Sequence, residues 1–198
     1  MGDFCSYVGQ AIDLFRYDPR SPMLFSSGLF LFVFLGFSLI YGLLKRRLTL
    51  RIVYVTLFSL YFYYKTSGLF FLLLVGLSLS DFAIGRLMHR SRRSGARKGL
   101  LVLSLLINLG LLCYFKYADL IVSAVAGLID RTLPLPDIFL PVGISFFTFQ
   151  SMSYVIDLYR RQIEPVRRWI DYLFYLSFFP QLVAGPIVRA RDFLPQIY

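Results

Sequence analysis

The chain has 198 residues, of which 58% are hydrophobic and 16% are charged, and its formal net charge is +10 at pH 7. This composition excludes a water-soluble monomer and indicates an integral membrane protein, in which each crossing takes about 20 residues. The positive charge does not indicate nucleic-acid binding, because the basic residues occupy short segments between apolar runs and form no basic, aromatic-rich soluble face.

Apolar runs in chain order predict an all-α, polytopic membrane fold with about six transmembrane or re-entrant helices. The second run is too short by itself for a hydrocarbon core of about 30 Å, so its flanks have to extend it. Residues 120–129 are predicted to continue the fourth run as an interfacial helix, and two prolines, Pro134 and Pro136, break the chain before the fifth. The predicted runs are 23–44, 52–64, 67–85, 99–115, 138–158 and a sixth that begins near Trp169.

The basic residues predict which ends of these helices face the cytoplasm. Fourteen of the 21 lysines and arginines form three clusters, which follow the first, third and fifth runs. Because cytoplasmic loops are rich in Lys and Arg, all three clusters are expected on the cytoplasmic side, with the N-terminus outside. The clusters are Lys45, Arg46, Arg47 and Arg51; Arg86, Arg90, Arg92, Arg93, Arg97 and Lys98; and Arg160, Arg161, Arg167 and Arg168.

The N-terminal 22 residues differ from the rest of the chain. They are too polar for a signal peptide, and we expect either an amphipathic helix on the outer surface or a disordered lead. Residues 23–198 are expected to form the transmembrane domain.

The fifth run contains an unusual polar motif between residues 140 and 150. Pro141 and Gly143 predict a loosened start of the helix, and backbone breaks at membrane depth persist only where protein or a water-filled cavity surrounds them. Polar side chains follow on two adjacent faces and are candidate walls of a substrate channel: Ser145, Thr148, Gln150 and Ser153. The alternative is structural. The hydroxyls then bond to their own helix, and Asp157, on the same face, pairs with Arg160 or Arg161.

A second break lies between residues 178 and 189. Pro180 cannot donate to the helix ladder, and Gly185 followed by Pro186 predicts unwinding near Ala184. The freed backbone groups are expected to face the interior, so Gln181, Gly185, Pro186 and Arg189 join the channel candidates, with Arg189 positioned to hold an anionic group. The alternative is that Arg189 extends to lipid headgroups.

Other reactive residue types are scattered. Cys5 and Cys113 form neither a disulfide framework nor a zinc site, and no metal site is predicted. His89 lies among six cations and is interpreted as a headgroup-facing histidine without a catalytic role. Asn108 is expected to make a hydrogen bond between helices, and Asp81 and Lys116 are expected near the membrane interfaces.

These motifs resemble the N-terminal half of the membrane-bound O-acyltransferases. The resemblance runs from about Met23 to the C-terminus, and within the family it is closest to bacterial polysaccharide acetylases of the alginate O-acetyltransferase type. The segments that carry it are 23–27 with the apolar run that follows, 108–112 with 115–117, 140–159 and 178–193.

The resemblance implies a multi-span enzyme of the bacterial inner membrane. Such an enzyme takes acyl groups, usually acetyl, from a cytoplasmic thioester such as acetyl-CoA and passes them to hydroxyls of an extracytoplasmic polysaccharide or carrier. It needs no bound cofactor, and its implied partners are membrane lipids and an extracytoplasmic acceptor or acetyltransferase protein. The related D-alanine exporter of teichoic acids belongs to the same family.

The family's catalytic histidine lies downstream of the Gly-Pro-Ile motif, and this sequence has no histidine after His89. Because an alcohol needs a general base to attack a thioester near neutral pH, we expect the 198 residues alone to be inactive and to need the missing C-terminal half. Two other functions stay open: a noncatalytic membrane component that binds an acyl or lipid-linked substrate, and a small transporter with discontinuous helices.

Overall fold

The computed structural model describes residues 28–44, 47–129, 140–186 and 188–197. These residues form α-helices and short 3-10 turns, and no strand occurs among them, which confirms the predicted all-α class. The elements are α2 (Gly28–Leu43), α3 (Leu48–Ser67), η1 (Gly68–Phe70), α4 (Phe71–Arg90), α5 (Ser94–Ile129), α6 (Ile144–Tyr159), α7 (Trp169–Ser177), α8 (Phe179–Ala184), α9 (Ala190–Phe193) and η2 (Leu194–Gln196). The predicted N-terminal lead lies outside the described residues.

The chain divides into two compact units, Met1–Leu72 and Leu73–Tyr198. In the first unit, α2 and α3 pack through aromatic rings. The ring of Phe37 lies 4.2 Å from that of Phe58 and 5.2 Å from that of Tyr54, measured between centroids. The Tyr54 hydroxyl donates to the carbonyl of Phe37 at 3.3 Å, and the guanidinium of Arg51 donates to the Tyr41 hydroxyl. Packing of aromatic rings, together with these two hydrogen bonds, therefore joins the two helices.

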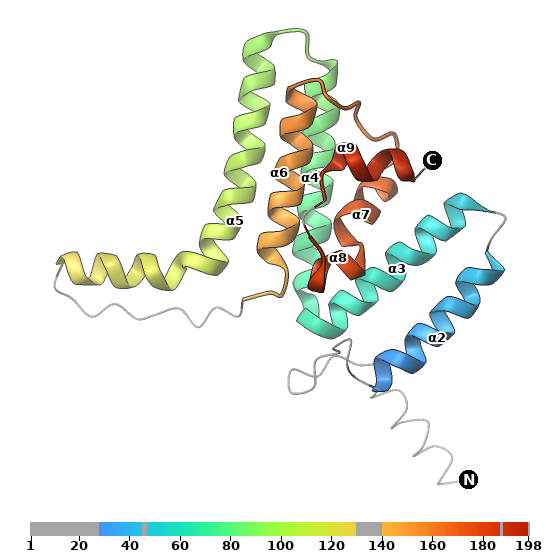
Figure 1. The fold of residues 1–198 in the computed structure, drawn as a ribbon. Coiled ribbons are helices and arrows are strands. Elements are labelled where there is room, and N and C mark those ends of the chain that lie inside the picture. The colour runs from blue at the N-terminus through green and yellow to red at the C-terminus, as the bar shows by residue number, and fades with distance from the viewer. Residues whose placement is uncertain (1–27, 45–46, 130–139, 187, 198) are drawn as a thin grey trace. The chain divides into compact units, whose positions relative to one another are not determined.

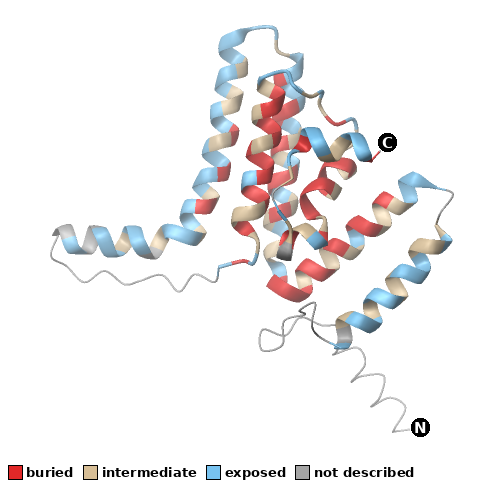
Figure 2. Cartoon of the chain, viewed as in Figure 1, coloured by how far each residue is buried: buried red, intermediate tan, exposed pale blue. Residues whose placement is uncertain are grey.

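The second unit is a helical bundle around α6. Figure 1 shows α6 with α5 on one side and α7, α8 and α9 on the other, and with α4 partly behind it. The apolar core brings together side chains from α4, α6 and α7, including Met88, Val155 and Leu176. The rings of Tyr154 and Tyr172 pack at 4.4 Å between centroids. Figure 2 shows the resulting pattern, in which α6 and α7 are largely buried and α5 is largely exposed.

The outer helix α5 has polar residues inside and apolar residues outside. Among the α5 residues whose burial is described, only Ser104, Asn108 and Leu112 are buried, at a spacing of four residues. Large apolar side chains cover the exposed side, and Leu106 is 65% exposed. A water-soluble helix has the opposite pattern, whereas lipid favours an apolar outer surface. The exposed surface of α5 therefore fits a membrane-embedded helix.

The lengths of the helices agree only in part with the six predicted crossings. Among the described residues, two stretches are long and apolar enough to cross a membrane, Leu48–Arg90 and Ser94–Ala118. The first covers two predicted runs and is interrupted at Gly68, where φ is +63°, so the second run does gain length from its flanks. The helix α5 continues to Ile129, and Figure 1 shows it bending in its C-terminal part, where an interfacial helix was predicted.

The predicted fifth and sixth crossings are shorter than expected. The predicted fifth run begins at Ile138, with a loosened helix start at Pro141 and Gly143, and α6 does start just after these residues, at Ile144. Pro141 and Gly143 form a turn in which the Ile144 amide bonds the Pro141 carbonyl at 3.3 Å. Sixteen residues give α6 a length of about 24 Å. The sixth run is divided into α7 and α8, each too short to cross a bilayer alone.

Two of the three basic clusters meet at one end of the second unit. The Arg97 guanidinium donates to the carbonyl of Tyr159 at 2.8 Å, and that of Arg86 donates to the carbonyl of Arg167 at 3.4 Å. The end of α4, the start of α5 and the end of α6 therefore lie together, as the charge pattern predicted for these two clusters. Which side of the membrane this end faces stays a prediction.

That prediction has a direct test. A reporter that is active only in the cytoplasm is fused after Gly95, at the exposed start of α5. We expect it to be active, because positively charged loops are retained on the cytoplasmic side. An enzyme active only outside, such as alkaline phosphatase, should be silent at the same fusion point. Phosphatase activity there would contradict the predicted topology.

Candidate functional site

The two motifs singled out in the sequence contact each other in the structure. Gly143, at the turn before α6, has φ of +78°, a left-handed conformation that favours glycine. A Cβ atom at this position would lie 2.9 Å from the carbonyl oxygen of Leu182 in α8. The glycine therefore serves two purposes: it permits the turn, and it lets the start of α6 approach α8.

Gln150 connects α6 to the break between α7 and α8. Its side-chain Nε2 donates to the carbonyl of Tyr175 at 3.1 Å and to Oε1 of Gln181 at 3.2 Å. The end of a helix leaves backbone carbonyls without partners, and Gln150 satisfies one of them at the end of α7. The other amide atom of Gln150, Oε1, is buried and has no hydrogen-bond partner among the described residues.

Tyr175 holds the segment that follows the second break. Its hydroxyl donates to the carbonyl of Val188 at 2.9 Å and lies 3.4 Å from the carbonyl of Gln150. The break falls where the sequence predicted, because α8 ends at Ala184 and Gly185 is extended, with φ of −89°. A Cβ atom on Gly185 would lie 2.6 Å from the Cα of Gln181, so the chain can turn here only with glycine.

The other channel candidates have varied surroundings. Thr148 is buried, and its hydroxyl donates to the carbonyls of Ile144 and Ser145 on its own helix, which was the structural alternative. Ser145 and Ser153 are half-buried on α6, whereas Pro186 and Arg189 are exposed, with Arg189 just before α9. Of the eight candidates, Gln150, Gln181 and Gly185 therefore come together, and the others do not join this contact.

The structural alternative for Asp157 is wrong. Asp157 is buried, and it forms no ion pair with Arg160 or Arg161 in the described part of the chain. One of its carboxylate oxygens has no hydrogen-bond partner there. The nearby ion pair is instead between Arg168 and Asp171, in which two guanidinium nitrogens each lie 3.0 Å from a carboxylate oxygen.

Sequence analysis missed a second polar cluster, which is centred on Asp81. This residue was expected near an interface, but it is fully buried in α4. Its carboxylate accepts hydrogen bonds from Ser104 at 2.5 Å, from Asn108 at 2.7 Å and from Ser151 at 2.5 Å. Ser151 also bonds the hydroxyl of Tyr172 at 2.7 Å. The predicted interhelical role of Asn108 is confirmed, and the cluster joins four helices, with α7 reached through Ser151.

One signal for this cluster was present in the sequence. Ser104 and Asn108 are four residues apart and lie on one face of an otherwise apolar helix, and an intramembrane Asp usually faces the interior of a bundle. No pattern along the chain identifies Ser151 and Tyr172 as partners, because they lie 70 and 91 residues from Asp81.

The described groups support binding and positioning more directly than bond-making chemistry. No group of three His, Cys, Asp or Glu side chains that could hold a metal ion occurs in the described ranges. His89 is exposed at the basic end of the bundle, and Cys113 is an exposed free thiol on α5. Three of the buried polar atoms that lack partners among the described residues, Asn108 Oδ1, Gln150 Oε1 and Asp157 Oδ2, are hydrogen-bond acceptors.

Comparison with known proteins finds relatives whose sequences are similar to this one. The chain is 34% identical over 180 residues to a probable alginate O-acetylase of Pseudomonas aeruginosa, and 33% identical over 180 residues to that of Pseudomonas syringae. A peptidoglycan O-acetyltransferase of Helicobacter pylori is 29% identical over 203 residues. Each match covers 88% of this chain. These matches bear out the resemblance of the chain to the membrane-bound O-acyltransferases.

The match covers a limited part of those relatives. The chain spans about a third of their length: 34% of each of the two alginate O-acetylases and 38% of the peptidoglycan enzyme. No family model matches the chain, and no solved structure matches it. The family resemblance seen in the sequence is thus confirmed, and the apolar helices together with the family identify a membrane protein.

Proposed function

We propose that these residues form part of a membrane O-acyltransferase. In this proposal the protein moves acetyl groups from a cytoplasmic thioester, such as acetyl-CoA, to hydroxyls of an extracytoplasmic polysaccharide or carrier. The observation that carries the proposal is the 34% identity to an alginate O-acetylase over 180 residues, with a peptidoglycan O-acetyltransferase among the relatives. The bacterial inner membrane, with the N-terminus outside, is the proposed location.

The contact between Gln150 and Gln181 is the proposed wall of the acyl path. It lies beside the break between α7 and α8, and broken helices inside a bilayer are tolerated where they line a cavity or are enclosed by protein. Gln150 Oε1 offers a buried acceptor without a partner in the described residues, as a site for a substrate hydroxyl or amide N–H requires. The other proposed wall residues are Ser145, Thr148, Ser153, Gly185, Pro186 and Arg189.

The proposal assigns the general base to a group outside these residues. Acyl transfer to a hydroxyl needs a base within hydrogen-bond reach of the attacking oxygen. The single histidine of the chain, His89, is exposed at the basic end of the bundle, whereas Gln150 is buried in α6. We therefore expect no turnover by the 198 residues alone, and turnover when a C-terminal part and an acceptor-side partner are present.

The experiment follows acetyl transfer in membranes that carry the natural gene product containing these residues. Labelled acetyl-CoA is supplied from the cytoplasmic side, and label in base-labile esters on extracytoplasmic polysaccharide is counted. Gln150→Leu and Gln181→Ala are each expected to lower the rate about tenfold, because a hydrogen bond to the substrate of roughly 1.4 kcal/mol is lost. The control is Gln196→Leu, which changes an exposed glutamine bonded only to the backbone of Asp192.

The outcomes separate the two candidate roles. If all three variants transferred acetyl groups at the same rate, at equal protein amounts, the proposal that Gln150 and Gln181 line the acyl path would be contradicted. If no thioester donor supported transfer but an acyl-carrying substrate still bound, the result would favour a noncatalytic membrane component. The lack of a histidine beside the two glutamines also supports that alternative.

A further inference from the structure

A separate cavity lies at the basic end of the second unit. It has a volume of about 400 Å³, and it is bounded by the end of α4, the start of α5 and the segment that follows α6. Its floor is apolar, with the buried side chains of Met88 and Leu158. Polar and charged side chains form the rim: His89, Ser91, Arg97, Arg161, Gln162 and Glu164.

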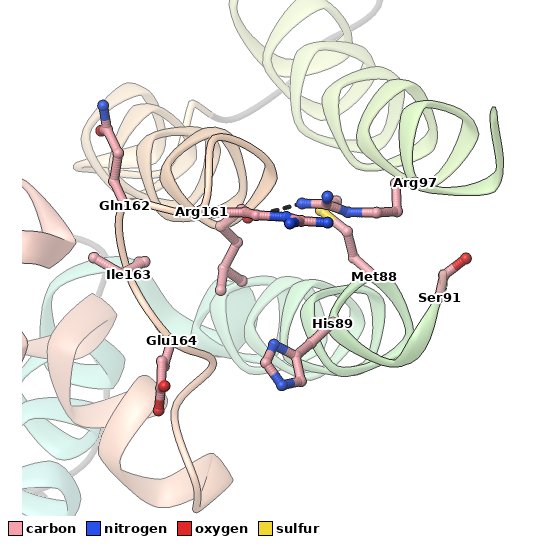
Figure 3. Close-up of a pocket in the computed structure, with 9 residues that line it drawn as sticks. Met88, His89, Ser91, Arg97, Arg161, Gln162, Ile163 and Glu164 are labelled. Carbon is pink, nitrogen blue, oxygen red and sulfur yellow. Dashed lines mark hydrogen bonds between the residues drawn. The ribbon is translucent and has the colours of Figure 1, made fainter. Parts of the chain in front are cut away.

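Two arginines reach this cavity from different elements. Figure 3 shows Arg97 extending from α5 toward the end of α6, where Arg161 begins, with His89 below them and Glu164 pointing away. Arg97 uses one guanidinium nitrogen to bond the carbonyls of Tyr159 and Leu158, which leaves its other N–H donors for a ligand. Neither arginine forms an ion pair in the described part of the chain.

The backbone at Arg161 adds an independent observation. The amide of Gln162 bonds the carbonyl of Asp157 at 2.9 Å, and that of Arg161 bonds the carbonyl of Leu158 at 3.1 Å. This double pattern closes a helix with a left-handed residue, usually glycine, and here that residue is Arg161 with φ of +59°. A side chain at this position is unfavourable relative to glycine. The arginine therefore sits, at an unfavourable backbone angle, on the rim of a cationic cavity.

We propose that this cavity binds a phosphate group. Two guanidinium groups on one rim match the oxygens of a phosphate, which accepts several charge-assisted hydrogen bonds at once. The apolar floor fits the carbon chain next to the phosphate. Because the cavity lies where basic clusters end apolar helices, an anionic lipid headgroup is one source of the phosphate, and a soluble phosphate compound is the other. The proposal stands independently of acetyl transfer.

The key variant is Arg161→Gly, because its effects on stability and binding have opposite signs. Glycine relieves the left-handed backbone, so the unfolding midpoint should not fall, while phosphate binding should weaken about tenfold or more through loss of a charge-assisted contact. Arg160→Gly is the matched control: it removes the neighbouring exposed arginine, which does not line the cavity. Arg161→Lys, which keeps the charge, should keep much of the binding.

Two probes identify the source of the phosphate. The protein is reconstituted in phosphatidylcholine nanodiscs that contain a minority of phosphatidylglycerol, and the retained phosphatidylglycerol is counted by native mass spectrometry, with and without inorganic pyrophosphate. Retention that depends on Arg161 and resists pyrophosphate supports a lipid headgroup. Retention that pyrophosphate abolishes, or Arg161-dependent binding of pyrophosphate itself, supports a soluble ligand. Equal binding by wild type and Arg161→Gly, or an equal loss in Arg160→Gly, would overturn the proposal.

Discussion

Asp81→Ala is expected to destabilise the second unit by about 3 kcal/mol. The buried carboxylate accepts hydrogen bonds from Ser104, Asn108 and Ser151, which come from two different helices. Removal of the shared acceptor takes from each buried donor its bond to Asp81, at a cost of roughly 1–3 kcal/mol per group. The donors can recover only part of this from the partners that remain, such as the Ser104 carbonyl for Asn108 and the Tyr172 hydroxyl for Ser151. The measurement is the unfolding midpoint of the detergent-solubilised protein in a denaturant titration.

Asp81→Asn separates the loss of the acceptor from the loss of volume. The asparagine keeps the shape and one acceptor oxygen, and serine hydroxyls both donate and accept, so they can reorient toward its amide. We expect a smaller loss than in Asp81→Ala. Asp192→Ala is the matched control, because the Asp192 side chain is 58% exposed and its ion-pair partner is the half-exposed Arg191. An Asp81→Ala midpoint equal to that of Asp192→Ala would show that the cluster does not hold the helices together.

Gly143→Ala is expected to lower stability by about 2–3 kcal/mol and to separate α6 from α8. Two costs add at this position. The left-handed φ of +78° disfavours any side chain by roughly 1–2 kcal/mol, and the new Cβ would lie 2.9 Å from the Leu182 carbonyl oxygen, a backbone atom that cannot rotate away. Because Gln150 and Gln181 lie on the same two helices, their hydrogen bond should also lengthen or break. The free energy of unfolding is measured as for Asp81.

The control for this change is Gly110→Ala. Gly110 lies within α5, and a Cβ there would meet nothing within 4 Å, so alanine should stabilise the helix by about 0.5–1 kcal/mol. Crosslinking of Gln150→Cys with Gln181→Cys by a short thiol-reactive linker gives a second readout, in which the crosslink should form readily when Gly143 is kept and slowly with Gly143→Ala. Equal unfolding midpoints and equal crosslinking in both glycine variants would show that the approach of α6 to α8 is not needed.

The backbone breaks could be predicted because their causes are local. Proline lacks an amide hydrogen and disfavours a helical residue before it, so Pro180 and Pro186 set the limits of α7 and α8 without reference to any other helix. The grouping of two basic clusters at one end likewise followed from the alternation of apolar runs. The start of α6 at Ile144, just after the predicted loosened entry at Pro141 and Gly143, has a local cause of the same kind.

The polar contacts could not be predicted because their partners are distant in sequence. Gln150 meets Tyr175 and Gln181, which lie 25 and 31 residues further along the chain. A pattern of three or four residues shows which face of a helix a side chain occupies, but it does not show which other helix covers that face. For the same reason Asp81 was expected at an interface, although the fold encloses it among four helices.

The sequence by itself determined the membrane class, the family resemblance, the helix breaks and the helix ends that carry basic clusters. The length of an apolar run, the chemistry of proline and charge all act over a few neighbouring residues. Only the tertiary structure decided that Asp81 has three hydrogen-bond donors, that Gln150 closes the end of α7, and that Arg97 and Arg161 share one cavity. These contacts depend on how the helices pack. The same helices in the same order along a chain are often compatible with more than one packing.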